Sequence, residues 1–411
     1  MKKILVLGAG AQGSAAAMRL DEEPDVSEII IADYNQDAID SLVKVLKKGI
    51  GKVVRGSRKD EIVAAAQGVD LIINAMPLDF GKNVLEAAIE VQANYQDFAA
   101  CENIVNTDNP DEDWVEGIKV MYDEYGKRFS AIGKTAIIGT GSAPGLTCVI
   151  ASRAVRELDS CDTINIMLYE GVETKRFVPF WWSPVVALWD MSKQAYAFEN
   201  GELIRRDAFS NPIKRSFPEA GEDEVTLVEH FHDEPVHMGL NSKEFFKDVK
   251  NIYFKYGGVG INFAKPFYQT GLLSHEKVLI NGKEIVPFDL VLSRIPPAPR
   301  TSEEVREILE EGMLSDTGAL VVEAYGKKDG KDVVVEAHAF APGLEDSYKK
   351  AGLSAEMYLT GQCGYLFSKM FVNEKFTQHG LISSDMLTDE QVDYYLGCAE
   401  ELDITYSIEI K

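Results

Sequence analysis

Hydrophobic residues in the first part of the chain gather in short runs, and amphipathic segments with helical spacing lie between them. The runs predict strands at residues 3–7, 27–33, 52–57, 69–77, 94–99 and 135–141. The segments between them predict helices. Strict alternation of strand and helix is typical of a parallel sheet covered on both faces. Residues 1–150 are therefore expected to form a doubly wound α/β domain.

The pattern changes after residue 163. Helices no longer separate the predicted strands regularly, and the strand-like segments look antiparallel. These strands are expected at residues 163–171, 251–258, 276–285, 319–326 and 332–341. Asp329-Gly330 predicts a tight hairpin turn between the last two. We expect a second domain over residues 151–350, of α+β class with a mostly antiparallel sheet.

A glycine motif follows the first predicted strand. Gly8, Gly10 and Gly13 have the spacing GxGxxG, they precede a predicted helix, and Asp33 ends the next strand. In this setting the glycines allow a tight turn, a close approach to a pyrophosphate and close packing of helix on strand. The acidic residue accepts hydrogen bonds from the adenosine ribose. The motif predicts a dinucleotide site that also includes Ala11, Gln12 and Tyr34.

The same segment bears on the choice of dinucleotide. Asp33 repels a 2′-phosphate, and Tyr34 follows it where an arginine would hold one, so NAD is favoured. Arg55 and Arg58, after the third strand, leave NADP open. The end of the fourth strand is expected near the nicotinamide, because ligands of parallel sheets bind at that edge. Its residues are Asn74, Ala75, Met76 and Pro77.

Charge and cysteine content narrow the class of protein. A formal net charge of −24 argues against nucleic acid as a partner, because polyanion binding needs a basic face. Five dispersed cysteines without a CxxC pair suggest a reducing cytoplasm. The six histidines lack metal-ligand spacing, so no metal site is expected. The chain has no apolar run long enough for a membrane span. We expect a protein of the cytoplasm that does not bind nucleic acid.

Taken together, these motifs resemble the saccharopine dehydrogenase (saccharopine reductase-like) family, and within it the lysine 6-dehydrogenase branch. The likeness rests on GAGAQG, ADYN, VDLIINAMP, NYQDFA, GTGSAPGLTCVIA and FWWSP. It implies an N-terminal Rossmann domain, a substrate domain, a C-terminal segment over residues 351–411 that returns to the Rossmann domain, and a homodimer. It also implies NAD(P)-linked oxidation of a C–N bond in an amino acid or opine, or the reverse imine reduction.

Two alternatives stay open at this point. The first is a polyamine reductase of the carboxynorspermidine or homospermidine type, which the tryptophans favour because an indole face attracts a cation. The second is a regulatory protein that binds the dinucleotide without turnover. For an enzyme of either type, the expected ligand is a small amino acid or amine.

Asp97 is the first candidate for chemistry. It ends the fifth predicted strand beside Tyr95, where an acid can orient the substrate amine or relay its proton. Glu102 is a nearby alternative. The alternative for Asp97 is a purely structural role, as a hydrogen-bond acceptor or a helix cap.

Substrate contacts are expected from two further segments. Backbone amides around Gly141 and Ser142 can cradle a carboxylate, and Arg176 can pair with one. Three of the four tryptophans lie in the stretch that follows Arg176. Trp189 is expected in the core. One of Trp181 and Trp182 is expected to face the substrate, with Trp182 favoured by its place in the WSP segment.

Overall fold

The computed structural model describes residues 1–101, 104–105 and 110–411, and the chain divides into two compact units. The first unit contains Met1–Val149 and Leu359–Leu402, and the second contains Ile150–Tyr358 and Asp403–Lys411. The chain forms most of the first unit and then most of the second. Residues 359–402 complete the first unit, and residues 403–411 complete the second. Every unit has a sheet of its own, described separately below.

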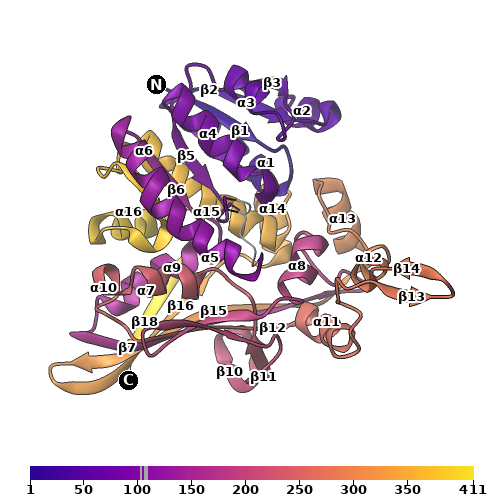
Figure 1. Ribbon diagram of the computed structural model, residues 1–411, viewed down its shortest axis with the longest axis vertical. Coiled ribbons are helices and arrows are strands. Elements are labelled where there is room, and N and C mark those ends of the chain that lie inside the picture. The colour runs from indigo at the N-terminus through magenta and orange to yellow at the C-terminus, as the bar shows by residue number, and fades with distance from the viewer. Residues whose placement is uncertain (102–103, 106–109) are drawn as a thin grey trace. The chain divides into compact units, whose positions relative to one another are not determined.

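The first unit is built on a seven-stranded parallel sheet with the order β17-β6-β5-β4-β1-β2-β3 (Figure 1). The order reverses between β1 and β4, which opens a binding edge at the carboxyl ends of these strands. This confirms the predicted doubly wound sheet. The strands are β1 (Lys2–Leu7), β2 (Val26–Asp33), β3 (Gly49–Val53), β4 (Leu71–Asn74), β5 (Asn94–Asp97), β6 (Thr135–Ile138) and β17 (Gly380–Ser383).

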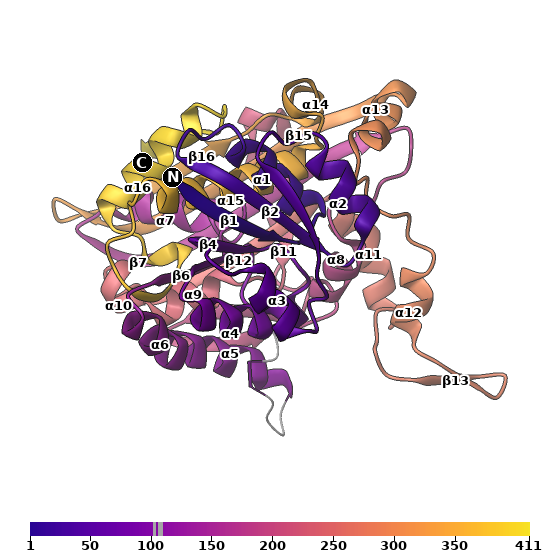
Figure 2. The ribbon, with the colours of Figure 1, turned by 90° about the horizontal axis from the view of Figure 1, so that it is seen from above.

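Helices cover this sheet, and α3 packs beside α4 (Figure 2). The core strand residues from Ile4 to Leu7 are fully buried, as a strand covered on both faces requires. The Asn35 side chain accepts hydrogen bonds from the first amides of α2 and caps that helix. The helices are α1 (Ala11–Leu20), α2 (Gln36–Val43), α3 (Lys59–Ala65), α4 (Gly81–Val91), α5 (Pro110–Val120), α6 (Gly126–Ala131), α15 (Ala355–Val372) and α16 (Asp389–Glu400).

Buried polar groups fix the C-terminal segment to this sheet. Gln96 of β5 donates from Nε2 to the carbonyl of Gly364 in α15 at 2.7 Å. Ser368 donates from Oγ to Oε1 of the same glutamine at 2.8 Å. β17 then extends the sheet as the parallel neighbour of β6. These contacts place α15, β17 and α16 in the first unit.

The second unit has a nine-stranded mixed sheet with the order β10-β11-β12-β7-β15-β16-β18, and β8 and β9 join it at β12. The pair β12–β7 is parallel and the other pairs are antiparallel, in agreement with the predicted mostly antiparallel sheet. The strands are β7 (Ser160–Thr174), β8 (Ala195–Glu199), β9 (Glu202–Arg206), β10 (Ile213–Phe217), β11 (Glu222–Glu229), β12 (Asn251–Gly258), β15 (Met313–Lys328), β16 (Lys331–Phe340) and β18 (Thr405–Ile410).

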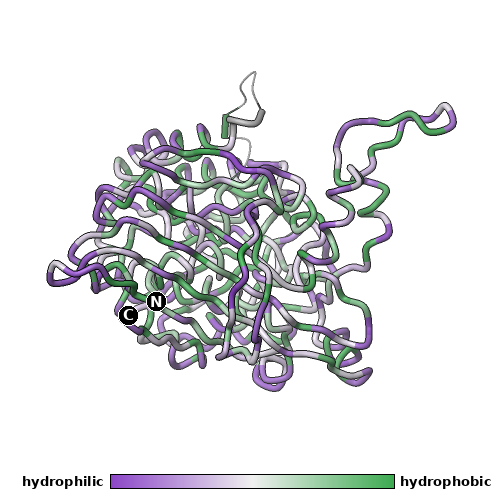
Figure 3. Tube along the Cα trace, turned by 90° about the horizontal axis from the view of Figure 1, so that it is seen from below, coloured by the Kyte–Doolittle hydropathy of each residue, from purple (hydrophilic) through white to green (hydrophobic). Residues whose placement is uncertain are grey.

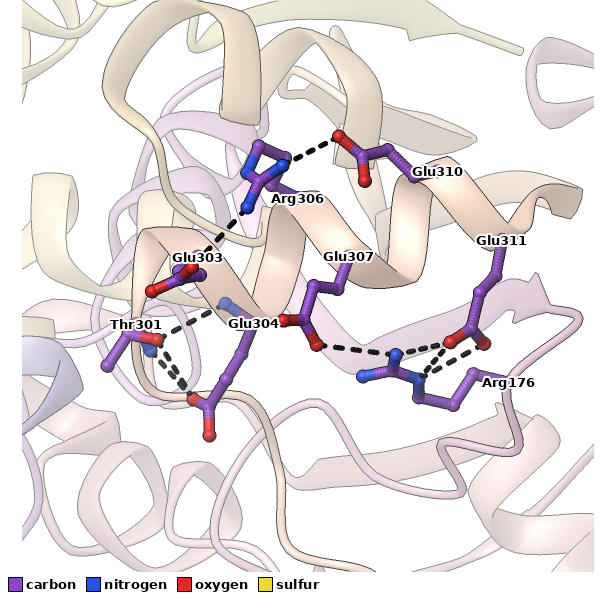
Figure 4. A network of polar contacts seen from close by, with 8 residues as sticks. All are labelled: Arg176, Thr301, Glu303, Glu304, Arg306, Glu307, Glu310 and Glu311. Atoms are coloured by element: carbon purple, nitrogen blue, oxygen red, sulfur yellow. Dashed lines mark hydrogen bonds and ion pairs between the residues drawn. The ribbon is translucent and has the colours of Figure 1, made fainter.

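Local signals set the turns and caps of this unit. Asp329 and Gly330 have φ angles of 52° and 74° and close the β15–β16 hairpin. Thr301 and Glu304 form a capping box at the start of α13 (Figure 4). Among the described residues, no helix combines the length and apolarity needed to cross a membrane. The helices are α7 (Leu146–Val155), α8 (Pro184–Asp190), α9 (Glu234–Leu240), α10 (Ser242–Phe245), α11 (Val259–Gln269), α12 (Pro287–Leu292), α13 (Ser302–Glu311) and α14 (Leu344–Ala351).

The end of the chain differs from the expectation for residues 351–411. β18 pairs with β16 in the second unit and does not remain with the first. The reason is that its backbone groups find their partners at the open edge of the larger sheet. Residues 276–285 also form a separate two-stranded hairpin, of β13 (Val278–Ile280) and β14 (Lys283–Ile285), outside that sheet.

Candidate active site

The loop between β1 and α1 is shaped by its glycines. Gly8 has a φ of 102°, and a Cβ there would lie 2.6 Å from the carbonyl oxygen of Ala75. A Cβ on Gly13 would lie 2.0 Å from the carbonyl oxygen of Gly8. No atom lies within 4 Å of the place where a Cβ of Gly10 would stand. Two glycines are thus needed for packing, and Gly10 leaves space above the loop for a ligand.

This space fits the pyrophosphate of a dinucleotide. The first-turn amides of α1 have no carbonyl within the helix to bond, and the helix dipole adds positive potential at that end. The first turn of α1 contains no acidic residue that would oppose an anion. The predicted positions Ala11 and Gln12 lie in this turn, directly after Gly10. The chain's own residues therefore provide a site of the right shape and polarity.

Asp33 lies at the end of β2 and holds the glycine loop. Its Oδ2 accepts a hydrogen bond from the amide of Ala9 at 2.8 Å, and its Oδ1 accepts one from the amide of Asn35 at 2.9 Å. Each carboxylate oxygen has a second lone pair. Asp33 can thus order the loop and still accept from a ribose hydroxyl. Tyr34 beside it is 78% exposed, so its ring is free to border an adenosine.

The two arginines that left NADP open are engaged with carboxylates. Arg55 donates from Nε to Glu61 at 2.9 Å, and Arg58 donates from Nε to Asp60 at 3.0 Å. Both pairs are exposed, so each is weak and can be exchanged for another anion. A 2′-phosphate would have to compete with Glu61 or Asp60 for these groups.

The loop after β4 packs against the glycine loop. Ala75 donates from its amide to the carbonyl of Leu7 at 2.8 Å. Asn74 is buried, donates from Nδ2 to the Tyr95 hydroxyl at 3.2 Å and accepts from the amide of Met76. Met76 and Pro77 continue this loop at the same edge of the sheet. The predicted nicotinamide side is therefore adjacent to the glycine loop.

Tyr95 and Asp97 form a buried pair. The Tyr95 hydroxyl donates to Oδ2 of Asp97 at 2.8 Å, and the Gly139 amide donates to Oδ1 at 2.9 Å. Asp97 is 1% exposed. Burial, followed by the Asp97 charge, holds the pKa of Tyr95 well above its usual value. The pair lies beneath the surface, where it joins β5 to the second glycine segment.

Cys101 is a member of this group that the sequence did not indicate. Its Sγ lies 3.5 Å from the Tyr95 hydroxyl and 3.8 Å from Oδ2 of Asp97. Burial raises the pKa of the Cys101 thiol well above its usual value, so it stays protonated. Glu102, the alternative acid, lies outside the described residues.

The second glycine segment is packed from several sides. Gly141 lies against the carbonyl of Phe98 and the side chain of Thr360, so a Cβ there would meet both at 3.4 and 3.3 Å. The Ser142 hydroxyl lies 2.7 Å from the Thr360 hydroxyl. This geometry ties the segment to α15. A substrate role for Gly141 and Ser142 remains a proposal.

Arg176 does not have a free guanidinium for a substrate carboxylate. It donates from Nε to both carboxylate oxygens of Glu311, at 3.0 and 3.1 Å, and contacts Glu307 at 3.5 Å (Figure 4). Hydrogen bonding to Arg176 lowers the pKa of the Glu311 carboxyl. The guanidinium is paired with α13, which the sequence could not place beside residue 176, and a substrate contact of Arg176 remains a proposal.

The three tryptophans differ in exposure, and the prediction for Trp189 is wrong. Trp181 is 4% exposed and packs in an apolar cluster with Val172 and Leu344, so it is a core residue. Trp189, expected in the core, is 39% exposed, with the Lys193 ammonium 4.5 Å from its ring centre. The buried stripe of α8 runs through Ala187 and Leu188, which turns position 189 outward. Trp182 is half-buried.

The sequence did not indicate a further pair of side chains, Glu170 and Tyr256. Glu170 ends the apolar part of β7, and Tyr256 precedes two glycines at the end of β12. The Tyr256 hydroxyl donates to the Glu170 carboxylate. A tyrosine followed by glycines at a strand end was the available signal. Within the described residues, no group of three histidine, cysteine or acidic side chains is arranged to hold a metal ion.

Comparison with known proteins identifies the first unit. Residues 4–137 match the family described as saccharopine dehydrogenase NADP binding domain. The first unit is therefore a nicotinamide dinucleotide-binding domain, as the glycine loop indicated. The fold of the whole chain is similar to that of saccharopine dehydrogenase (L-Glu forming) from Saccharomyces cerevisiae. The TM-score is 0.69 at 13% identity, with 100% of both chains covered.

Two curated proteins match along almost the full length of the chain. Carboxynorspermidine synthase from Vibrio alginolyticus is 26% identical over 408 residues, which cover 93% of this chain and 92% of that protein. Carboxyaminopropylagmatine dehydrogenase from Synechocystis is 22% identical over 418 residues, covering 97% and 96%. Both relatives therefore include counterparts of both units.

Proposed function

We propose that this chain, which belongs to the saccharopine dehydrogenase family, joins a small amine to an amino-acid aldehyde by reducing the imine that forms between them. The protein is an NAD(P)-dependent oxidoreductase that acts on a C–N bond. The substrate is the proposed part. Among the alternatives considered from the sequence, the polyamine type is now preferred over the saccharopine and lysine type.

The observation that carries this preference is the full-length match to carboxynorspermidine synthase. The names of both curated relatives describe an amine that bears a carboxylated aminopropyl group. Such a group has the carbon skeleton of aspartate β-semialdehyde. The amine that it joins differs between the two names, so the amine of this chain is a separate question.

The chemistry asks little covalent help from the protein. Condensation of amine and aldehyde releases water and gives an imine. Reduction adds a hydride to the imine carbon and a proton to its nitrogen, which leaves a secondary amine. A bound nicotinamide supplies the hydride. The residues around Gly10 and Asp33 would hold the dinucleotide, and the loop from Asn74 to Pro77 would border its reactive end.

We further propose NAD as the preferred dinucleotide. The Asp33 carboxylate at the end of β2 disfavours a second negative charge nearby. Arg55 and Arg58 are already paired with Glu61 and Asp60. The name of the matched family refers to NADP, so the comparison of the two cofactors in one assay is informative.

Oxidative deamination of the saccharopine or lysine type is the second candidate. The match to the dinucleotide-binding domain of the family favours this reaction. Neither name of the two curated relatives refers to saccharopine or lysine. An assay separates the two. The purified protein is supplied with NADH or NADPH, aspartate β-semialdehyde and either 1,3-diaminopropane or agmatine, and loss of the reduced-cofactor absorbance is followed. Saccharopine and lysine with the oxidised cofactors form the opposing panel. Turnover in the second panel alone would reverse our choice.

We also propose a cytoplasmic homodimer. The five dispersed cysteines, which include no CxxC pair, support a reducing compartment. The β13–β14 hairpin extends away from the rest of the second unit (Figure 2) and has hydrophobic stretches along its trace (Figure 3). Leu279 is 73% exposed, and Val278 and Ile280 are also exposed. Such an apolar arm suits burial against a second copy.

A further inference from the structure

β12 (Asn251–Gly258) ends beside Glu170 of β7, which runs on to Thr174. They pair in parallel, with Leu168 opposite Tyr256 and Glu170 opposite Gly258. A Cβ on Gly258 would lie 2.0 Å from the carbonyl oxygen of Glu170, so only glycine allows this approach. The Tyr256 hydroxyl donates a hydrogen bond to the Glu170 carboxylate. The two neighbouring strands therefore present one carboxylate and one phenol as a fixed pair.

Glu170 is half-buried and lacks the cation that accompanies the buried acid Glu229 of this sheet. Among the described residues, Tyr256 is its hydrogen-bond partner and it takes part in no ion pair. Glu229, by contrast, contacts Arg206 at 3.3 Å and Lys255 at 3.0 Å. A carboxylate withdrawn from water without a cation is costly. Burial accordingly raises the pKa of Glu170, and a cationic ligand would relieve this cost.

His230 gives a second, independent indication of a ligand. It is 2% exposed, its ring lies edge-on to Tyr256 at 5.1 Å between centres, and its Nε2 has no hydrogen-bond partner. Its Nδ1 is 2.7 Å from the carbonyl of Phe231, which only accepts. Nδ1 therefore holds the proton, and Nε2 is an acceptor. Burial lowers the pKa of His230 to about 3, which keeps the ring neutral.

The surroundings of the pair are apolar and aromatic. Trp182 and Tyr256 both pack against the buried cluster that contains Phe180 and Ile261. An indole attracts a cation through its face, and apolar walls suit methylene groups. The Glu170 carboxylate and Nε2 of His230 can accept further hydrogen bonds beside these aromatic rings. They match a ligand that is rich in N–H groups and has an alkyl chain.

We propose that Glu170 and Tyr256 form the binding site for the cationic amine of an alkylamine substrate, with His230 as an additional acceptor and Trp182 as an aromatic wall. This inference rests on the proposed function and deepens it, since it names the residues that recognise the amine. In this proposal the second unit recognises the amine substrate.

The test compares Glu170→Gln with Glu173→Gln, which removes an exposed carboxylate from the same strand. Glu170→Gln keeps the side-chain size and removes the charge. We expect the KM for the amine to rise about ten- to a hundredfold, the range of a hydrogen bond to a charged group. The KM for the reduced cofactor and for the aldehyde should stay unchanged. Glu173→Gln should behave as the wild type does.

Calorimetric titration of the cofactor-loaded protein with 1,3-diaminopropane, and separately with agmatine, gives a readout that needs no turnover. Binding heat should be lost in Glu170→Gln and retained in Glu173→Gln. If Glu170→Gln does not fold, Tyr256→Phe, which leaves the carboxylate without its donor, should still change the amine KM and leave the cofactor KM as it was.

The outcomes separate the two proposals. Wild-type turnover of an amine with equal KM values in both glutamine variants would overturn the role of Glu170 and leave the function standing. A wild-type protein that turns over no amine with the aldehyde, and reacts with saccharopine or lysine, would overturn the function. Amine binding that depends on Glu170 in that protein would still support the site.

Discussion

The carboxylate of Asp33 accepts a hydrogen bond from the amide of Ala9 at 2.8 Å, which joins the end of β2 to the glycine loop. The residue expected to select the cofactor therefore also orders the loop that binds it. A change at this position alters both the charge near the ribose and the shape of the pyrophosphate site.

Asp33→Asn should weaken NADH binding and reduce the preference for NADH over NADPH. The amide nitrogen cannot accept from either backbone N–H, and the lost charge no longer repels a 2′-phosphate. We expect a loss of about tenfold in NADH affinity, from about one charge-assisted hydrogen bond. Fluorescence titration with both cofactors measures it, and Asp37→Asn on the exposed face of α2 is the control. An unchanged cofactor ratio would show that Asp33 does not select.

Gly13→Ala and Gly10→Ala should fail in different ways. A methyl group at position 13 meets the Gly8 carbonyl at 2.0 Å, whereas none of the protein's atoms lies within 4 Å at position 10. Gly13→Ala should lower the free energy of unfolding by about 1–3 kcal/mol through overpacking. Gly10→Ala should fold normally and lose cofactor affinity, because the methyl occupies the ligand's space. Urea unfolding and cofactor titration on both variants decide; equal stability losses would contradict this.

Asp97→Ala should act mainly on stability. Removal of the carboxylate leaves the Tyr95 hydroxyl and the Gly139 amide without their acceptor inside the protein. Unsatisfied buried donors cost about 1–3 kcal/mol each, so the unfolding midpoint in urea should fall clearly. Tyr95→Phe removes one donor only and should cost less. If Asp97→Ala retains full stability and loses turnover, the proton-relay role first considered for it would be supported instead.

His230 should make the protein sensitive to acid. Its pKa is about 3 in the folded state, because burial disfavours the charged ring, and higher in the unfolded chain. The unfolded state therefore binds the proton first, and stability is complete above the unfolded pKa and declines as pH falls toward the folded value. From about pH 7 to about pH 5 the loss should reach about 2 kcal/mol. His230→Gln should remove that part of the slope in urea unfolding at several pH values.

Leu279→Ser should weaken the proposed dimer. The side chain lies on the projecting β13–β14 hairpin and is 73% exposed in the single chain. If the hairpin is buried against a second copy, light scattering after gel filtration should show a shift toward monomer at low concentration. Lys283→Ser, on the opposite strand, is the polar control. A wild-type protein that is monomeric at every concentration would remove the proposal.

The sequence alone determined much of the first unit. Alternation of strands and helices, the glycine spacing and Asp33 are local signals, and β1, α1 and β2 form where they indicated. The hairpin turn at Asp329 was predictable for the same reason. Each depends on neighbours within a few positions in the chain.

Tertiary structure alone decided which side chains are available for chemistry. Arg176 was assigned to a substrate, but α13 brings Glu311 to it from 135 positions away. Asp97 looked accessible at a strand end, but Tyr95 and Gly139 enclose it. The pair of Glu170 and Tyr256 exists because β7 and β12 run in parallel. These contacts form only when segments that are distant in the sequence pack together. The spacing of residues within one segment therefore does not predict them.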